Sequence, residues 1–122
     1  MFAPRMKRGN PYVTVLVTAP DMETARLLAR TALEGRRAAC ASLVPELESH
    51  YWWQGKLESS AEVLILLKTT RKRVAALRAC ILEHHPYDTP EFVVLPVTGG
   101  SKKYLDWISA SVAEEAAPAS KV

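Results

Sequence analysis

The sequence predicts an α+β domain of the ferredoxin-like type, a βαββαβ antiparallel sheet with an additional C-terminal helix. Three observations support this fold class. Patterns typical of strands and helices follow one another in the order strand, helix, strand, strand, helix, strand, helix. A short turn joins the two central strands, which must therefore be antiparallel, and this argues against the alternative of an open parallel α/β sheet. A length of 122 residues suits one core rather than two.

The first strand and the first helix are expected within residues 12–35. Tyr12–Ala19 is a short run rich in β-branched residues, which is typical of a buried strand. A helix is expected to start after Asp21, because this carboxylate can accept hydrogen bonds from the free N–H groups of the first turn. Gly35 is expected at the C′ position, just beyond the helix end. One helix face is apolar and is expected to be buried: Ala25, Leu28, Ala29 and Ala32.

A long hairpin is expected in the middle of the chain. Residues 38–53 read as an extended segment, and Pro45 predicts a bulge or kink within it, because proline cannot donate to a strand ladder. Residues 54–56 have the composition of a hairpin turn. The returning strand is expected over residues 61–69. Its centre is apolar at every position, as in a strand covered on both faces.

The second helix is expected to be capped by Thr70 and to run to about His84. It should end before Pro86, because the residue that precedes a proline avoids helical geometry. Residues 90–97 predict a fourth strand, and Pro96 places it at the edge of the sheet.

A last helix is expected after Ser101, whose hydroxyl can serve as its N-cap. Residues 1–11 are interpreted as a flexible leader, 12–115 as the single domain and 116–122 as a flexible tail. Helical spacing gives the last helix an apolar inner face: Tyr104, Leu105, Ile108 and Val112.

Composition and charge exclude several classes of protein. Hydrophobic residues make up 48% and charged residues 24% of the chain, so wholesale disorder is excluded. The longest strongly apolar run is residues 63–67, far shorter than a membrane helix. Four of the 16 basic residues lie in the terminal segments, so the net charge of +3 gives little support for a nucleic-acid partner. Two cysteines and no apolar stretch behind the basic N-terminus predict a cytoplasmic protein with reduced thiols.

Three consecutive aromatic residues, Tyr51, Trp52 and Trp53, lie near the expected hairpin tip. Neighbours in a strand point to opposite faces, and one layer of helices can cover only one of those faces. The remaining aromatic surface forms either a small local cluster or, as we favour, an interface with another chain.

His84 and His85 end the second helix and could bind a divalent metal ion through their imidazole nitrogens. Alternatively, one is partly buried with a hydrogen bond and the other is solvated, since neighbours on a helix diverge by about 100°. Cys40 and Cys80 belong to no C-x-x-C pair; they are interpreted as small packing residues, with metal contact as the second choice. No phosphate-binding loop, G-x-S-x-G or H-E-x-x-H motif is present, and no nucleophile–base pair is visible, so no enzyme is expected.

Taken together, several short segments resemble the CutA family, the divalent-cation tolerance proteins. They occur in the order found in that family and span roughly residues 12–112. The matching segments are Val15-Leu16-Val17-Thr18-Ala19-Pro20-Asp21, Arg37-Ala38-Ala39-Cys40-Ala41, Tyr51-Trp52-Trp53-Gln54-Gly55-Lys56, Leu67-Lys68-Thr69, His84-His85-Pro86-Tyr87, Thr89-Pro90-Glu91 and Tyr104-Leu105-Asp106-Trp107.

The resemblance implies a ferredoxin-like fold, a tight homotrimer, a cytosolic setting, binding of copper or other divalent cations, and a role in metal tolerance without catalysis. The trimer also resembles that of nitrogen-regulatory signalling proteins, which makes a small-ligand sensor the alternative function. Some bacterial relatives carry a cysteine that is assigned to copper together with the paired histidines; here Val17 takes its place. A site with His84 and His85 but without a thiolate is expected to hold copper more weakly, especially Cu(I).

For a sensor, the ligand site would lie in a cleft between subunits. Lys68, at the end of the third expected strand, and Glu91, at the start of the fourth, can both lie near Tyr87 in a ferredoxin-like sheet. The alternative for Lys68 and Glu91 is a simple salt bridge.

Overall fold

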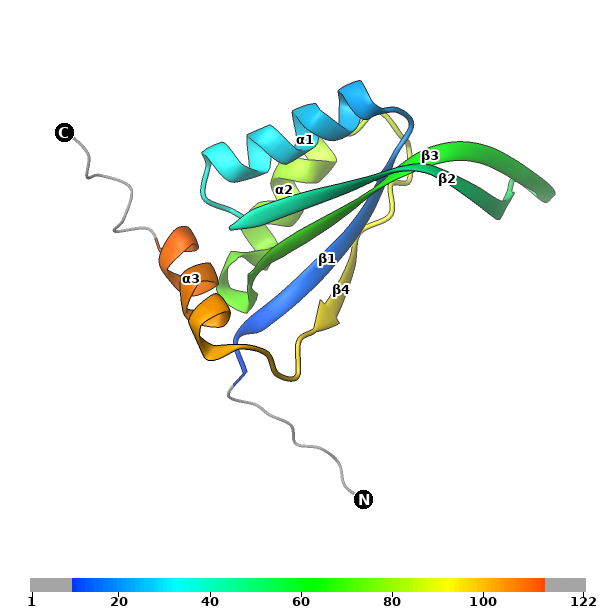
Figure 1. The fold of residues 1–122 in the computed structure, drawn as a ribbon. Helices are drawn as coiled ribbons and strands as arrows, with labels where there is room; N and C mark the ends of the chain where they lie inside the picture. Colours follow the sequence, from blue (N-terminus) through cyan, green and yellow to red (C-terminus); the bar gives the residue numbers. More distant parts are fainter. Residues whose placement is uncertain (1–9, 114–122) are drawn as a thin grey trace, which may run out of the picture.

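Residues 10–113 are described by the computed structural model, and they form an antiparallel sheet with three α-helices (Figure 1). The strand order is β2-β3-β1-β4, which confirms the predicted ferredoxin-like fold class. The predicted tail, residues 116–122, and most of the predicted leader lie outside the described residues. The elements are β1 (Tyr12–Ala19), α1 (Met22–Glu34), β2 (Cys40–Trp53), β3 (Lys56–Thr70), a 3₁₀ turn (Arg71–Arg73), α2 (Val74–His84), β4 (Val93–Pro96) and α3 (Lys102–Val112).

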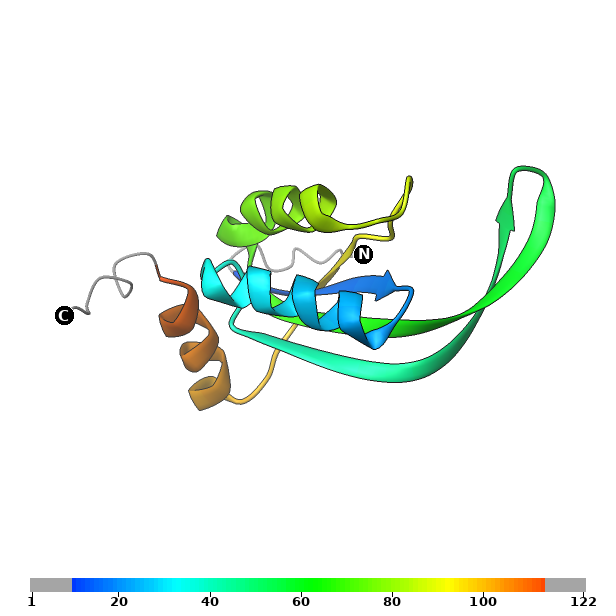
Figure 2. The same ribbon diagram turned by 90° about the horizontal axis from the view of Figure 1, so that it is seen from above.

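The helices α1 and α2 cover one face of the sheet, while α3 lies at the end of the sheet where β1 begins (Figures 1 and 2). The Tyr12 and Ser109 hydroxyls form a hydrogen bond of 2.9 Å. Because neighbouring strand residues point to opposite faces, Tyr12 faces away from the buried Val13, and α3 therefore packs on the side opposite α1 and α2. None of the helices within residues 10–113 combines the length and the apolar character needed to cross a membrane.

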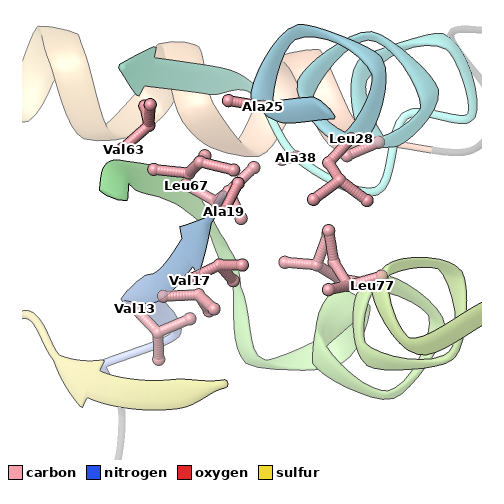
Figure 3. Packing of buried hydrophobic residues seen from close by; sticks show 13 residues of the cluster. Val13, Val17, Ala19, Ala25, Leu28, Ala38, Val63, Leu67 and Leu77 are labelled. Atoms are coloured by element: carbon pink, nitrogen blue, oxygen red, sulfur yellow. The ribbon is translucent and has the colours of Figure 1, made fainter. Parts of the chain in front are cut away.

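The core lies between the sheet and the pair α1–α2. Alternate residues of β1 face the helices and are buried, as are alternate residues of β3. Figure 3 shows Leu28 of α1 and Leu77 of α2 pointing toward the sheet residues Val17 and Leu67. The sheet face that carries Leu64 and Leu66 is only half-buried, so the expectation that β3 is covered on both faces is not met within one chain.

The β2–β3 hairpin extends beyond the helices as a curved arm (Figure 2). The predicted bulge lies between Val44 and Leu47, and Glu46 within it has a φ of 64°. Gln54 and Gly55 form the turn with φ values of 52° and 80°, which is typical of a type I′ hairpin turn. The strand β3 starts at Lys56, five residues before the predicted start. Its first residues are polar and mostly exposed, but they still form strand pairs with β2.

Two of the predicted helix ends need correction. The Asp21 carboxylate accepts from the Thr24 N–H at 2.8 Å, as predicted for an N-cap. Gly35 is itself the C-cap with a φ of −91°, and the left-handed residue is Arg36, with a φ of 55°. Thr70 makes no capping hydrogen bond, because a 3₁₀ turn separates it from the start of α2.

The last two elements agree with the prediction in type but not in every detail. The strand β4 is an edge strand as expected, but it spans four residues rather than residues 90–97. The Ser101 hydroxyl caps α3 by accepting from the Tyr104 N–H. The Tyr104 ring is exposed and stacks on Trp107, so its predicted place on the inner face is wrong; α3 packs at the end of the sheet and buries only Ile108 and Val112 fully.

Leu28→Ala is expected to lower the free energy of unfolding by about 2–5 kcal/mol, because it leaves a cavity where a 1% exposed side chain fills the core. Leu27→Ala is the matched control on the same helix, since Leu27 is 51% exposed, and its effect should stay within about 0.5 kcal/mol. Urea denaturation of both variants at one protein concentration provides the measurement. Equal losses would contradict the assignment of the buried face.

Candidate functional site

A groove of about 880 Å³ lies between the hairpin arm and the loop that follows α2. We use "arm" for residues 47–62, the part of the hairpin beyond the bulge. The arm supplies one wall and the loop supplies the other. The lining consists of residues 49–53, Glu58 and Glu62 from the arm, residues 87–89 and Glu91 from the loop, and Thr18 at the end of β1.

The groove is acidic. Four carboxylates and one imidazole line it, and no lysine or arginine does so among the described residues: Glu58, Glu62, Asp88, Glu91 and His50. Glu62 is the most buried of the carboxylates, with only 8% of its surface exposed. A buried charge is costly unless a counter-charge or hydrogen bonds compensate it. The groove therefore has a net negative potential centred on Glu62.

The Tyr87 hydroxyl donates to Glu62 Oε2 at 2.6 Å. Burial raises the pKa of Tyr87 well above its usual value, and the hydrogen bond and the negative charge of Glu62 raise it further. Partial shielding from water raises the pKa of Glu91, and the charge of Glu62 adds to that rise. Glu62 thus influences the protonation of two other groups that line the groove.

The two histidines occupy different surroundings. His84 is exposed, and its Nδ1 lies 2.9 Å from the Cys80 carbonyl oxygen. His85 is buried; its Nε2 lies 2.7 Å from the Thr18 carbonyl oxygen, and its Nδ1 accepts from the Tyr87 N–H at 3.1 Å. A carbonyl can only accept and an N–H can only donate, so both nitrogens of His85 are already engaged.

This geometry does not fit a metal site made by the histidine pair. Coordination requires a free nitrogen lone pair, which His85 lacks and only Nε2 of His84 can offer. Within residues 10–113, no group of three or more His, Cys, Asp or Glu side chains is arranged to hold a metal ion. Val17, at the position of the relatives' cysteine, is fully buried in the core between sheet and helices.

The cysteines are separate from the groove lining. Cys80 is buried in α2, and burial raises the pKa of its thiol, which favours the protonated form that binds metals poorly. Cys40 is half-buried, with its Sγ 3.9 Å from Lys68 Nζ and 3.8 Å from Ser42 Oγ. The packing interpretation suits Cys80, and neither thiol reaches the histidines in any contact between described residues.

The predicted ligand cleft is only partly assembled within one chain. Tyr87 and Glu91 line the groove together, but Lys68 does not. Lys68 lies six residues beyond Glu62 on β3, which corresponds to about 20 Å along a strand. The predicted alternative, a salt bridge between Lys68 and Glu91, is absent from the ion pairs among described residues.

The aromatic residues of the arm are all exposed. Trp52 is 72% exposed, and Tyr51 and Trp53 are each about 40% exposed. All three aromatic rings of the arm are thus partly or largely open to solvent in the single chain. The arm projects past α1 and α2, and neither helix reaches it (Figure 2). The ring pairs among described residues involve other side chains, so a local aromatic cluster is not formed.

The carboxylates Glu58, Glu62 and Asp88 were not identified from the sequence as site residues. Glu62 offered a signal, since it is a charged residue at the start of the apolar run 63–67. Glu58 and Asp88 offered none, because acidic residues in hairpins and loops usually face solvent.

Known proteins resemble this chain over most of its length. A family model for CutA1 divalent ion tolerance proteins matches residues 13–111. Divalent-cation tolerance protein CutA of Escherichia coli O139:H28 is 52% identical over 100 residues, which cover 82% of this chain and 89% of that protein.

Solved structures agree with this similarity. The crystal structure of CutA1 from Oryza sativa has a TM-score of 0.83 and 40% identity, and the match covers 86% of this chain and 96% of that one. The periplasmic divalent cation tolerance protein CutA from Archaeoglobus fulgidus has a TM-score of 0.81 and 34% identity, with coverage of 84% and 99%.

Glu62→Gln is expected to lower the pKa values of both Tyr87 and Glu91, because the charge that disfavours their ionisation is removed. An ultraviolet titration of the phenols and a carbon NMR titration of the Glu91 carboxyl provide the two measurements. Glu58→Gln is the control, since Glu58 lines the same groove but contributes to neither shift. Equal effects of the two variants would contradict the central position of Glu62.

Proposed function

The chain belongs to the CutA1 family of divalent ion tolerance proteins, and on that premise we propose that it is a non-enzymatic homotrimer that binds divalent cations and contributes to metal-ion response. The observation that carries the proposal is the acidic groove. Glu62 as a whole residue is nine-tenths buried there, and the one hydrogen-bond partner of its carboxylate among the described residues is the neutral Tyr87 hydroxyl. A divalent cation would compensate this charge.

The donors in the groove suggest which cations it takes. Carboxylate oxygens suit Mg²⁺, Ca²⁺ and Mn²⁺, and the nearby His50 imidazole adds a donor that suits Zn²⁺ and Cu²⁺. Cu(I) prefers thiolate or thioether ligands, and the groove lining contains neither. We therefore propose Cu²⁺ or another divalent cation as ligand. Glu62 and Glu91 are the first candidates, and water would complete the coordination, since no three such donors converge among residues 10–113.

A homotrimer is supported by the apolar surface that one chain leaves uncovered. The exposed rings of Tyr51, Trp52 and Trp53 are the proposed interface on the arm. The edge strand β4 is exposed at every position, and edge strands tend to pair with another chain. We place the protein in the cytoplasm on the basis of its two free cysteines, although the Archaeoglobus relative is described as periplasmic.

The alternative function is a trimeric sensor of small ligands that uses clefts between subunits. It is favoured by the volume of the groove, which lies within the range of small-molecule sites, and by its aromatic wall. In a trimer, Lys68 of a neighbouring copy is the cation that would complete the predicted cleft with Tyr87 and Glu91. Competition titrations with copper, zinc and small anions distinguish the two functions.

Glu62→Gln and Glu91→Gln are each expected to weaken binding of Zn²⁺ or Cu²⁺ by about tenfold or more, because each removes a charged oxygen donor. Binding should also weaken on acidification at a higher pH than for an ordinary carboxylate, since the pKa of Glu91 is raised and a protonated carboxyl does not bind cations.

Isothermal titration calorimetry gives the affinities. Glu34→Gln, on the exposed end of α1, serves as a control for non-specific loss of negative charge. His84→Ala tests the histidine pair that the sequence predicts. Loss of binding in His84→Ala with full binding in Glu62→Gln would move the site to the histidines.

Sedimentation equilibrium near micromolar concentration is expected to give about three times the chain mass of 13.5 kDa. Covering the exposed rings of the arm and pairing the open strand edge both favour association. A monomer under these conditions would contradict the proposed assembly.

A further inference from the structure

Three hydrogen bonds connect β1, the loop after α2 and β3, and His85 lies in the middle of the series. Its Nε2 bonds the Thr18 carbonyl oxygen of β1 at 2.7 Å, and its Nδ1 bonds the Tyr87 N–H at 3.1 Å. The Tyr87 hydroxyl then bonds Glu62 of β3 at 2.6 Å. Thr18 is paired with Leu64 in the β1–β3 ladder, and Leu64 lies two residues after Glu62 on β3. The three hydrogen bonds and the strand pairing therefore form a closed ring of contacts.

The partners of His85 define its tautomer. The Thr18 carbonyl accepts, so Nε2 carries the proton; the Tyr87 N–H donates, so Nδ1 presents its lone pair. The residue is 8% exposed, so both bonds are largely shielded from water. A metal ion at His85 would have to break one bond and leave a buried backbone group without a partner.

We propose that His85 is a positioning residue of the groove rather than a metal ligand: it holds Tyr87 where the phenol reaches Glu62. The proposal rests on the function proposed above, in which Glu62 belongs to the cation site. The contacts extend beyond the hydrogen bonds, because the rings of His85 and Tyr87 also lie against each other, with centroids 4.7 Å apart at an angle of 47°.

The sequence around His85 is suited to this role. Pro86 requires an extended residue before it, and His85 has a φ of −83° and a ψ of 137°. This conformation ends α2 and turns the ring away from His84, toward β1. His84 instead stays on the exposed surface and bonds its own helix. Adjacent histidines thus have separate roles in this chain.

The test compares His85→Asn, His85→Ala and His84→Ala. The asparagine amide oxygen lies near the place of Nδ1, where it can accept from the Tyr87 N–H as His85 does, but the amide is a poor ligand for Zn²⁺. We expect His85→Asn to keep Zn²⁺ affinity within about threefold of the parent and His85→Ala to lose about tenfold or more. His85→Ala should also let Tyr87 ionise at lower pH, because its bond to Glu62 is loosened, and His84→Ala should leave that titration unchanged.

A second measurement uses the parent protein. A long-range proton–nitrogen NMR spectrum should show His85 with its proton on Nε2, and Zn²⁺ should not shift its Nδ1 signal. Equal loss of Zn²⁺ affinity in His85→Asn and His85→Ala, with an unchanged Tyr87 titration and a Zn²⁺-dependent shift at His85, would overturn the proposal. If the parent binds no Zn²⁺, the function proposed above fails, while the tautomer and the Tyr87 titration still decide the role of His85.

Discussion

Two short helices cannot cover a long hairpin, and this mismatch in length determines much of the molecule's surface. The helices α1 and α2 contain 13 and 11 residues, so each is about 15–20 Å long. The strands β2 and β3 contain 14 and 15 residues, which corresponds to almost 50 Å when extended. The part of the sheet beneath the helices forms the core, and the remainder leaves the body as the arm. Every aromatic side chain of the arm is consequently open to contact with a second chain.

The same mismatch creates the groove and its charge. The bulge at Glu46 lets the arm curve, and the loop after α2 lies opposite it, so the two form facing walls. Glu62 lies where the arm leaves the sheet, buried enough to be costly as a free charge and yet open to the groove on one side. The hydrogen bond from Tyr87 compensates only part of that charge, because a neutral phenol donates a hydrogen bond but carries no positive charge. The pKa of Glu91 is raised mainly by its partial burial, and the negative charge of Glu62 raises it further.

The sequence predicted the features that depend on neighbours along the chain. Alternation in β1, the cap at Asp21, the bulge near Pro45 and the edge position of β4 all follow from local residue chemistry, and the structure confirms them. The sequence-based prediction was wrong where contacts with an element distant in the sequence determine the local structure. The early residues of β3 are polar and pair only because β2 is extended beside them.

The groove also depends on distant elements, since its two walls come from segments 25 or more residues apart in the sequence. Glu62 was visible as a charge beside an apolar run, but its partner Tyr87 follows from the path of the loop, which no local pattern specifies. The histidine pair illustrates the converse. Adjacency in the sequence suggests a shared metal ion, whereas the proline after His85 directs one ring inward and leaves the other outside.

Val17 and His85 together bear on the metal site proposed for this chain. The valine fills a core position with 0% exposure, so this strand presents no soft ligand, and the adjacent Thr18 carbonyl engages the imidazole nitrogen that a metal would need. In the proposed function, the donors left for a cation are the carboxylate oxygens that line the groove. A site of this kind would favour cations that accept carboxylate and water over those that require sulfur. Under the proposal, His85 holds Tyr87 against Glu62, so a residue that the sequence pattern assigns to the metal instead positions a wall of the groove.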